Sequence, residues 1–180
     1  KAEALTRNLE SFARFLNEAV LSVAQFIDLT KIAKKTKISR HAVPRYFEIL
    51  EDTLIGYRVH PFSPLVEAQD LIRHPKFYLF DNGVYNGMLG NFVPSQDRLG
   101  VLAEQTVFSQ LLHSASAREQ DINISSFRTR RGLEVDFIVQ LARRTLAIEV
   151  KNNDSLSADD CDGLLFFKKS LSKPCDLFIF

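Results

Sequence analysis

The sequence predicts a mixed α/β protein, α+β overall, in which a helical N-terminal region precedes a second region of order αβββαβ. Two patterns carry this prediction: apolar residues recur at helical spacing near the start of the chain, and three β-prone segments follow one another between residues 124 and 150. The chain has 180 residues, of which 46% are hydrophobic and 25% charged, a composition typical of proteins that bury a core. Its two cysteines match neither a disulfide framework nor a zinc motif, so a reducing cytoplasmic location is expected.

The first expected element is an amphipathic helix from residue 3 to about residue 23. Its apolar residues follow the three- and four-residue spacing of one helical face: Leu5, Leu9, Phe12, Phe15, Leu16 and Ala19. A short second helix is expected over residues 29–33, followed by a basic turn over residues 34–37. No apolar run approaches the roughly 18 residues that a membrane-spanning helix needs, which excludes membrane insertion.

A third helix is expected, with Ser39 as its N-cap and its end near Asp52. The residues expected on its inner face share helical spacing: Val43, Phe47 and Leu50. Pro44 would lie near the fifth position, where its missing N–H removes a helical hydrogen bond. The helix therefore either begins later or bends at Pro44.

Two β-prone segments, 54–59 and 76–80, follow this helix, and the proline-containing residues 60–64 turn the chain between them. Three helices followed by a two-stranded ribbon are the order of a winged helix-turn-helix, a small DNA-binding module. Its candidates for phosphate contact are Lys34, Lys35, Lys37, Arg40, His41 and Arg45. The alternative is a solvated or protein-binding face, because winged helices often serve as protein contacts.

The second region begins with a helix expected over residues 99–113, with Glu104 close to its inner face. The inward residues would be Leu102, Ala103, Val107, Leu111 and Leu112. Strands are expected over residues 124–129, 133–141 and 145–150, and a final strand ends at Phe180. Before that strand, a helix over residues 158–171 offers three core candidates: Leu164, Leu165 and Phe167. Residues 84–98 are the expected boundary between domains 1–84 and 85–180.

Charged residues stand at the ends of two of these otherwise apolar strands. Alternation places Glu134 and Asp136 on one face, opposite Val135, Phe137 and Val139. On the next strand Glu149 and Lys151 share a face, opposite Leu146, Ile148 and Val150. Pairing of the two strands as a hairpin would bring the acids and the lysine together, an arrangement that is costly on a half-buried sheet unless the charges are paired or bind a cation.

Asp136 and Glu149 offer the oxygen ligands that Mg²⁺ or Mn²⁺ prefers. Lys151 could stabilise the charge on a water or hydroxide that attacks a phosphodiester. The alternative is a salt bridge between Lys151 and one of the acids.

These residues resemble the restriction-endonuclease-like PD-(D/E)xK fold, whose core is αβββαβ with an acid on the second strand and (D/E)xK on the third. Asp136 matches the first acid, and Glu149 and Lys151 match the tripeptide. The resemblance implies that Glu104 is the extra acid that many members carry in the preceding helix, and that the backbone carbonyl of Val150 joins the metal ligands. Secondary candidates are Glu134 and Arg128. The last helix lacks the glutamine or tyrosine with which some nuclease branches hold DNA.

A winged helix followed by such a domain is similar to the uncharacterised C-terminal region that follows AAA-type ATPase modules in many prokaryotic proteins. Four segments carry this likeness: 45–53, 76–83, 132–137 and 148–151. It implies an ATPase module upstream of Lys1, and the chain is expected to be a piece of a longer protein. No GxxxxGK[ST] motif occurs, so no ATP site of that type is expected here.

Three functions remain open at this level. The first is a Mg²⁺-dependent nuclease that uses Asp136, Glu149, Lys151 and Glu104 and holds DNA with the winged helix. The second is a catalytically silent module of the same fold that binds or regulates the ATPase, and the third is a winged-helix DNA-binding regulator.

Overall fold

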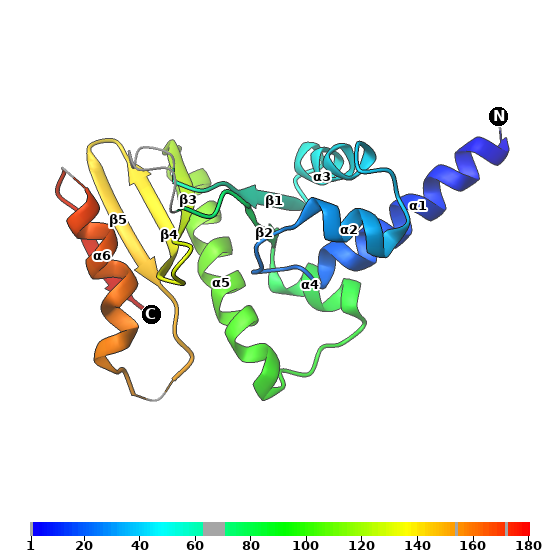
Figure 1. Ribbon diagram of the computed structural model, residues 1–180. Coiled ribbons are helices and arrows are strands. Elements are labelled where there is room, and N and C mark those ends of the chain that lie inside the picture. Colours follow the sequence, from blue (N-terminus) through cyan, green and yellow to red (C-terminus); the bar gives the residue numbers. More distant parts are fainter. Residues whose placement is uncertain (1, 63–70, 154, 172) are drawn as a thin grey trace. The chain divides into compact units, whose positions relative to one another are not determined.

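The computed structural model describes the whole chain except residues 1, 63–70, 154 and 172 (Figure 1). The architecture is mixed α/β, as the sequence predicts. The chain forms two compact units: an N-terminal unit of residues 1–58 and 76–93, and a C-terminal unit of residues 59–75 and 94–180. Ser63 and Pro64, part of the turn expected between the first two strands, lie outside the described residues.

The N-terminal unit starts with helices α1 (Ala2–Val20) and α2 (Leu29–Thr36). The prediction of a basic turn over residues 34–37 is wrong, because α2 continues through most of it. Asp28 caps α2 by accepting the N–H groups of Thr30 and Lys31, and Thr36 is buried together with the preceding apolar residues. Lys37 ends the helix in the left-handed region, with φ of 55°.

Helix α3 (Ala42–Asp52) begins later than expected, with His41 rather than Ser39 at the N-cap position. The Ser39 hydroxyl instead accepts the N–H of His41 at 3.3 Å. Pro44 is the third residue of the helix, where a missing N–H leaves no hydrogen bond unmade. The predicted inner face is confirmed, because Val43, Phe47 and Leu50 are all buried.

Strands β1 (Gly56–Val59) and β2 (Lys76–Leu79) form a two-stranded sheet. The sheet packs on α3 through Phe77, whose ring lies 5.2 Å from that of Phe47. A fourth helix, α4 (Asn82–Leu89), follows in a segment for which the sequence pattern predicts no helix. Asp81 caps it by accepting the N–H of Val84 at 2.7 Å.

The C-terminal unit contains α5 (Gln96–Ala117), β3 (Ile122–Arg128), β4 (Glu134–Leu141), β5 (Arg144–Glu149), the 3-10 helix η1 (Ala158–Cys161), α6 (Asp162–Ser170) and β6 (Asp176–Ile179). The sheet has the order β3-β4-β5-β6; β3, β4 and β5 are antiparallel neighbours, and β6 is parallel to β5. Figure 1 shows α6 on one face of this sheet and α5 on the other. The element order αβββαβ is therefore present.

The buried face of α5 differs from the expected one. Gln105, Phe108 and Ser109 are buried. The five residues predicted to point inwards are only half-buried: Leu102, Ala103, Val107, Leu111 and Leu112. The ring of Phe108 stacks on that of Phe137 in β4, with centroids 6.3 Å apart. A hydrophobic pattern does not predict burial of Gln105, because its side chain is polar. The side chain donates a hydrogen bond to the hydroxyl of Ser109 at 3.1 Å.

A β-bulge in β4 breaks the predicted alternation of side chains. The register shifts between Ser125 and Phe127, which pair with Ile138 and Val135, so β4 carries one extra residue there. Val135 and Ile138 therefore both join the core cluster beneath α6, with Leu164 and Phe167. Phe137 packs towards α5 instead, so the prediction that Val135 and Phe137 share a face is wrong.

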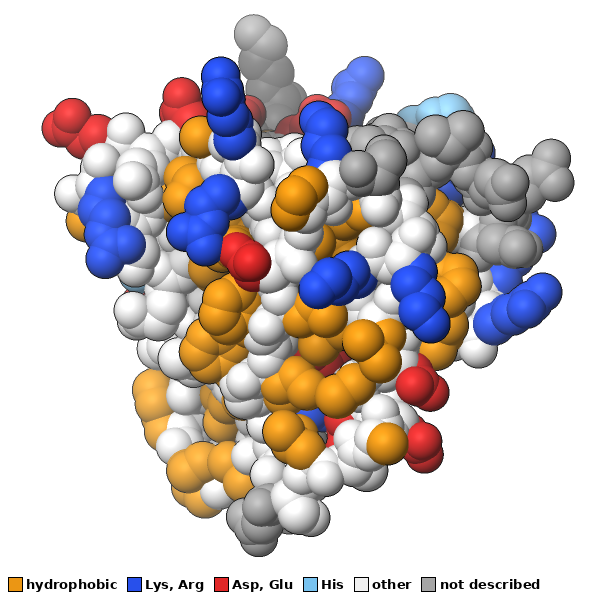
Figure 2. All heavy atoms as spheres, turned by 90° about the vertical axis from the view of Figure 1, so that its left-hand side faces the viewer, with side chains coloured by type: hydrophobic (Ala, Val, Ile, Leu, Met, Phe, Trp, Pro, Cys, Tyr) orange, Lys and Arg blue, Asp and Glu red, His pale blue; other side chains and the backbone are white. Residues whose placement is uncertain are grey.

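Apolar side chains are also exposed on the C-terminal unit. Figure 2 shows apolar side chains gathered below a basic region on the side of the molecule that carries α6. Leu165, a predicted core residue, is 47% exposed, so that prediction is wrong, whereas Leu164 and Phe167 are buried as expected. Within the described residues, no helix combines the length and the apolar character that a membrane span requires.

Candidate functional site

The pairing of β4 with β5 brings Asp136 and Glu149 together. The paired residues Phe137 and Ile148 lie next to them, one on each strand. Both acids are buried, with only 6% of Asp136 and 7% of Glu149 exposed. The Oδ2 atom of Asp136 accepts the backbone N–H of Val150 at 2.9 Å, so Asp136 is held at the end of β5.

The two carboxylate oxygens of Glu149 have different surroundings. Oε1 lies 3.0 Å from the Nζ atom of Lys151. Oε2 is buried and makes no hydrogen bond to any part of the chain that the structure describes. Because a buried, unsatisfied carboxylate oxygen is costly, this atom is a ready ligand for a cation or a hydrogen-bond donor from outside the chain.

The pKa of Glu149 is raised from 4.5 to about 7, and burial of the side chain is the largest cause. The negative charge of Asp136 adds to this increase, and Glu134 contributes a smaller part. The ion pair with Lys151 opposes the shift but does not cancel it. Near neutral pH the side chain of Glu149 is therefore poised between its protonated and charged forms.

Lys151 also contacts Asp160, a residue that no sequence motif connects with the site. Its Nζ atom lies 3.6 Å from Oδ1 of Asp160, in η1. The other oxygen of Asp160 accepts both the N–H and the hydroxyl of Ser157, at 2.8 and 2.7 Å, in a capping box. Burial alone would lower the pKa of Lys151, but Glu149 and Asp160 outweigh it, so the pKa is raised and the ammonium group stays charged.

The backbone of this site is fixed by β6. The N–H of Lys151 donates to the carbonyl of Phe180 at 2.8 Å, and the N–H of Phe180 donates to the carbonyl of Glu149 at 3.0 Å. These two hydrogen bonds continue the parallel pairing of β5 with β6 beyond the ends of both strands. Glu149 and Lys151 are therefore held in register on an extended backbone.

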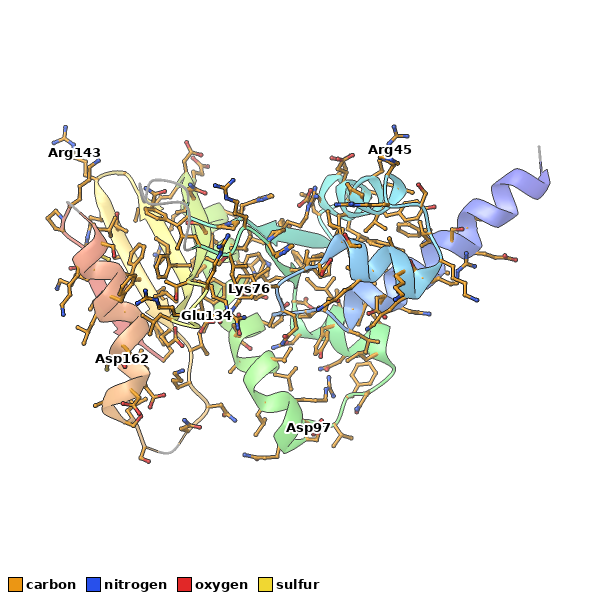
Figure 3. The ribbon with its side chains drawn as sticks, in the orientation of Figure 1. Arg45, Lys76, Asp97, Glu134, Arg143 and Asp162 are labelled. Carbon is orange, nitrogen blue, oxygen red and sulfur yellow. The ribbon has the colours of Figure 1, made fainter. Side chains whose placement is uncertain are left out.

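Glu134 borders the site at the start of β4, where Figure 3 shows it near the middle of the C-terminal unit. Its Oε2 atom lies 3.6 Å from Nε of Arg128, which is its partner in the β3–β4 register. Gly163 in α6 lies against the backbone of Glu134, so closely that a Cβ atom would overlap the carbonyl oxygen. The start of α6 therefore fixes the start of β4.

The third expected acid, Glu104, lies half-buried in α5. Among the described residues, no group of three or more His, Cys, Asp or Glu side chains has an arrangement that could hold a metal ion. Asp136 and Glu149 are neighbours on β4 and β5, and the backbone N–H of Val150 donates to Asp136. The oxygen ligands for a cation would come from these two carboxylates.

The six predicted phosphate contacts lie in α2, in α3 and in the loop between these helices, and all are exposed: Lys34, Lys35, Lys37, Arg40, His41 and Arg45. Figure 3 shows Arg45 projecting outwards from α3. Lys35 forms an ion pair with Glu18 of α1 at 2.5 Å. Residues 29–47 contain no acidic residue. The acid that pairs with Lys35 comes from α1, which packs on α2, so this ion pair is not visible in the local sequence.

Residues 1–95 match a family described as Domain of unknown function (DUF8612), and residues 99–179 match one described as Domain of unknown function (DUF4143). Neither description names an activity. Comparisons with curated proteins and with solved structures gave no match.

Proposed function

The chain belongs to the family described as Domain of unknown function (DUF8612), and this description gives no activity, so we propose a function from the acidic site. The proposed function is divalent-metal-dependent hydrolysis of phosphodiester bonds in nucleic acid. The site comprises Asp136, Glu149 and Lys151 at adjacent strand ends, with Asp160 beside the lysine. The proposal includes a nuclease-like role for the C-terminal unit and nucleic-acid binding, most simply of DNA, by the N-terminal unit.

The observation that carries this proposal is the buried Oε2 atom of Glu149, which makes no hydrogen bond within the described chain. The negative charge of Asp136 raises the pKa of Glu149, and the ion pair with Lys151 does not cancel the increase. Mg²⁺ is commonly held by one or two carboxylates and keeps several of its waters. A pair of acids therefore fits Mg²⁺ or Mn²⁺ without a third protein ligand.

The chain's own residues have separate tasks in this proposal. Asp136 and Glu149 would bind the cation, which would supply Lewis-acid activation of the phosphodiester. Lys151, kept charged by Glu149 and Asp160, would stabilise negative charge on the attacking oxygen and on the phosphate. Ser157 keeps Asp160 in place through its two hydrogen bonds.

The N-terminal unit supplies exposed cations for the phosphate backbone. Lys34, Lys37, Arg40 and Arg45 are exposed, and no acid intervenes along the chain between them. Phosphate contacts give affinity that falls with salt and carry no sequence information. This unit would therefore hold nucleic acid without reading its bases.

The competing function is a catalytically silent module in which Lys151 merely neutralises the acids. Calorimetric titration of Mn²⁺ into the chain and into Asp136→Asn separates the two functions without requiring the correct nucleic acid. Asp121→Asn makes the same substitution at an exposed position where β3 begins, at the other end of the sheet, and is the matched control. Binding by the wild type and the control but not by Asp136→Asn supports the metal site.

Equal, negligible heats in all three proteins would overturn the metal-site proposal and favour the silent module. If Mn²⁺ binds, cleavage of single-stranded, duplex and branched DNA and of RNA is then measured with Mg²⁺ present. Lys151→Ala is the variant expected to bind Mn²⁺ and yet fail to cleave. A Lys151→Ala variant that cleaves at the wild-type rate would remove Lys151 from the mechanism.

A further inference from the structure

The outer face of α6 is unusual for an exposed helix. Asp162, Leu165, Phe166 and Lys169 follow the spacing i, i+3, i+4 and i+7, which places them on one side of the helix. All four are exposed, and the two apolar side chains have exposed fractions of 47% and 43%. The opposite side of α6 is also apolar, because Leu164 and Phe167 lie in the core cluster.

This outer face is held firmly enough to serve as a binding surface. The ring of Phe166 lies 6.1 Å from that of the buried Phe127, and Gly163 fixes the start of α6 against β4. Within the described residues, neither Asp162 nor Lys169 forms an ion pair. An acid at the start of a helix and a base at its end suit the helix dipole, but the dipole does not explain two exposed apolar side chains between them.

The order acid, apolar, apolar, base is complementary to its own reverse. When two such helices pack antiparallel about a two-fold axis between residues 165 and 166, each position n faces position 331 − n of the other helix. Leu165 then faces Phe166 of the second copy, and Asp162 faces Lys169. We propose that α6 is a self-association surface, on which two copies of this chain form a two-fold symmetric dimer.

Charge distribution favours a second copy over nucleic acid as the occupant. The start of this face is acidic, since Asp159 and Asp162 are both exposed there, and a phosphate backbone lying along α6 would be repelled. The end of the helix is basic, with Lys168 and Lys169 exposed. Figure 3 shows Asp162 at the lower end of α6, and Figure 2 shows Lys and Arg side chains in the upper part of this side of the molecule.

One helix face is a small interface, because stable protein interfaces bury roughly 1,200–2,000 Å² in total. Leu156, exposed near the start of η1, extends the apolar area beyond α6. The dimer is therefore of modest affinity. Sedimentation equilibrium over a concentration series up to about 200 µM covers a Kd in the micromolar range.

The test uses charge reversal on the whole chain. In Lys169→Asp both symmetric ion pairs become repulsive, so the dimer Kd should rise by about tenfold or more. The double variant Asp162→Lys with Lys169→Asp restores the opposite charges and should recover the wild-type Kd. Lys168→Asp is the matched control, because residue 168 lies about 100° away around the helix and faces no charged partner in this arrangement; its Kd should change by less than about threefold.

Two outcomes would overturn the proposal. A wild-type chain that stays monomeric throughout the concentration series shows that α6 does not mediate self-association, and an equal effect of Lys168→Asp and Lys169→Asp shows that only net charge matters. Circular dichroism of each variant confirms that it is folded. None of these measurements depends on metal binding or cleavage, so the dimer proposal is tested independently of the nuclease proposal.

Discussion

Gly163 in α6 packs directly on the backbone of Glu134, the first residue of β4. A Cβ atom at position 163 would overlap the carbonyl oxygen of Glu134 and approach its N atom to 3.2 Å. Since Asp136 lies two residues further along β4, this contact links the packing of α6 to the position of a proposed metal ligand. Backbone atoms cannot move aside as the end of a flexible side chain can.

The substitution Gly163→Ala is therefore expected to lower the free energy of unfolding by roughly 1–3 kcal/mol, because α6 must shift away from β4. Urea unfolding followed by circular dichroism measures this change. Gly100→Ala is the matched control, since Gly100 lies within α5 and no heavy atom outside its own helix lies within 4 Å of the position that the added methyl group would take. That control should keep or gain stability, by up to about 1 kcal/mol; equal losses in both variants would contradict the backbone contact.

Glu149→Gln should stabilise the metal-free protein at high pH but not at low pH. The pKa of Glu149 is raised from 4.5 to about 7, so the folded state binds this proton more tightly than the unfolded state does. The stability that Glu149 contributes is full below pH 4.5 and is lost as the pH rises through about 7. The shift corresponds to at most about 3 kcal/mol of unfolding free energy.

Urea unfolding of the wild type and Glu149→Gln at about pH 5 and about pH 8 measures this difference. The two proteins should be similar at the lower pH, and the variant should be more stable at the higher one. Glu48→Gln, which removes an exposed carboxylate from α3, is the matched control. A Glu149→Gln variant that is less stable than the wild type at the higher pH would show that the ion pair with Lys151 dominates instead.

Phe108→Ala should destabilise the protein far more than Val107→Ala. Phe108 is buried and stacks on Phe137, so its truncation leaves a cavity and should cost about 3–5 kcal/mol. Val107, which the sequence pattern placed inward, is only half-buried and should cost less than about 1.5 kcal/mol. Thermal or urea unfolding compares the two, and similar losses would mean that α5 packs by its predicted face.

Lys34→Ala and Lys35→Ala should affect nucleic-acid binding differently. Both lysines are exposed in α2, but Lys35 is already paired with Glu18. Loss of a phosphate contact at Lys34 should reduce the slope of log K against log salt by about 0.9. Fluorescence anisotropy with labelled DNA at several salt concentrations measures the slopes, and a larger effect of Lys35→Ala would show that the ion pair opens on binding.

The sequence predicted the αβββαβ order because strands, turns and helices in this region each have a clear local signal. Glycine or basic turns separate the strands, and the acids stand out against apolar neighbours. Helix α4 was not predicted, because Gly83 and Gly87 lower the helix propensity of this segment, although Asp81 at its start was a capping signal. The inner face of α5 was not predicted, because the buried Gln105 is of a residue type that is usually exposed.

The acidic pair could be predicted, whereas its environment could not. Alternation along two neighbouring strands brought Asp136 and Glu149 to the same place in the hairpin. The bulge in β4 has no signal in the sequence, so the packing of Val135 and Ile138 in the same core cluster could not be predicted. Asp160 lies on a separate element and meets Lys151 only through the tertiary structure, although the spacing from Ser157 was a local sign of a capping box.

The hydrogen bonds that Phe180 makes to Glu149 and Lys151 have a consequence for the order of folding. Strands β3, β4 and β5 are joined by short turns and can form from local hairpins, but β6 pairs with β5 only after η1 and α6 have been crossed. Contacts between distant segments close a large loop and form slowly. The acids can thus approach one another early, while the backbone that aligns the lysine with them is completed only when the last strand docks.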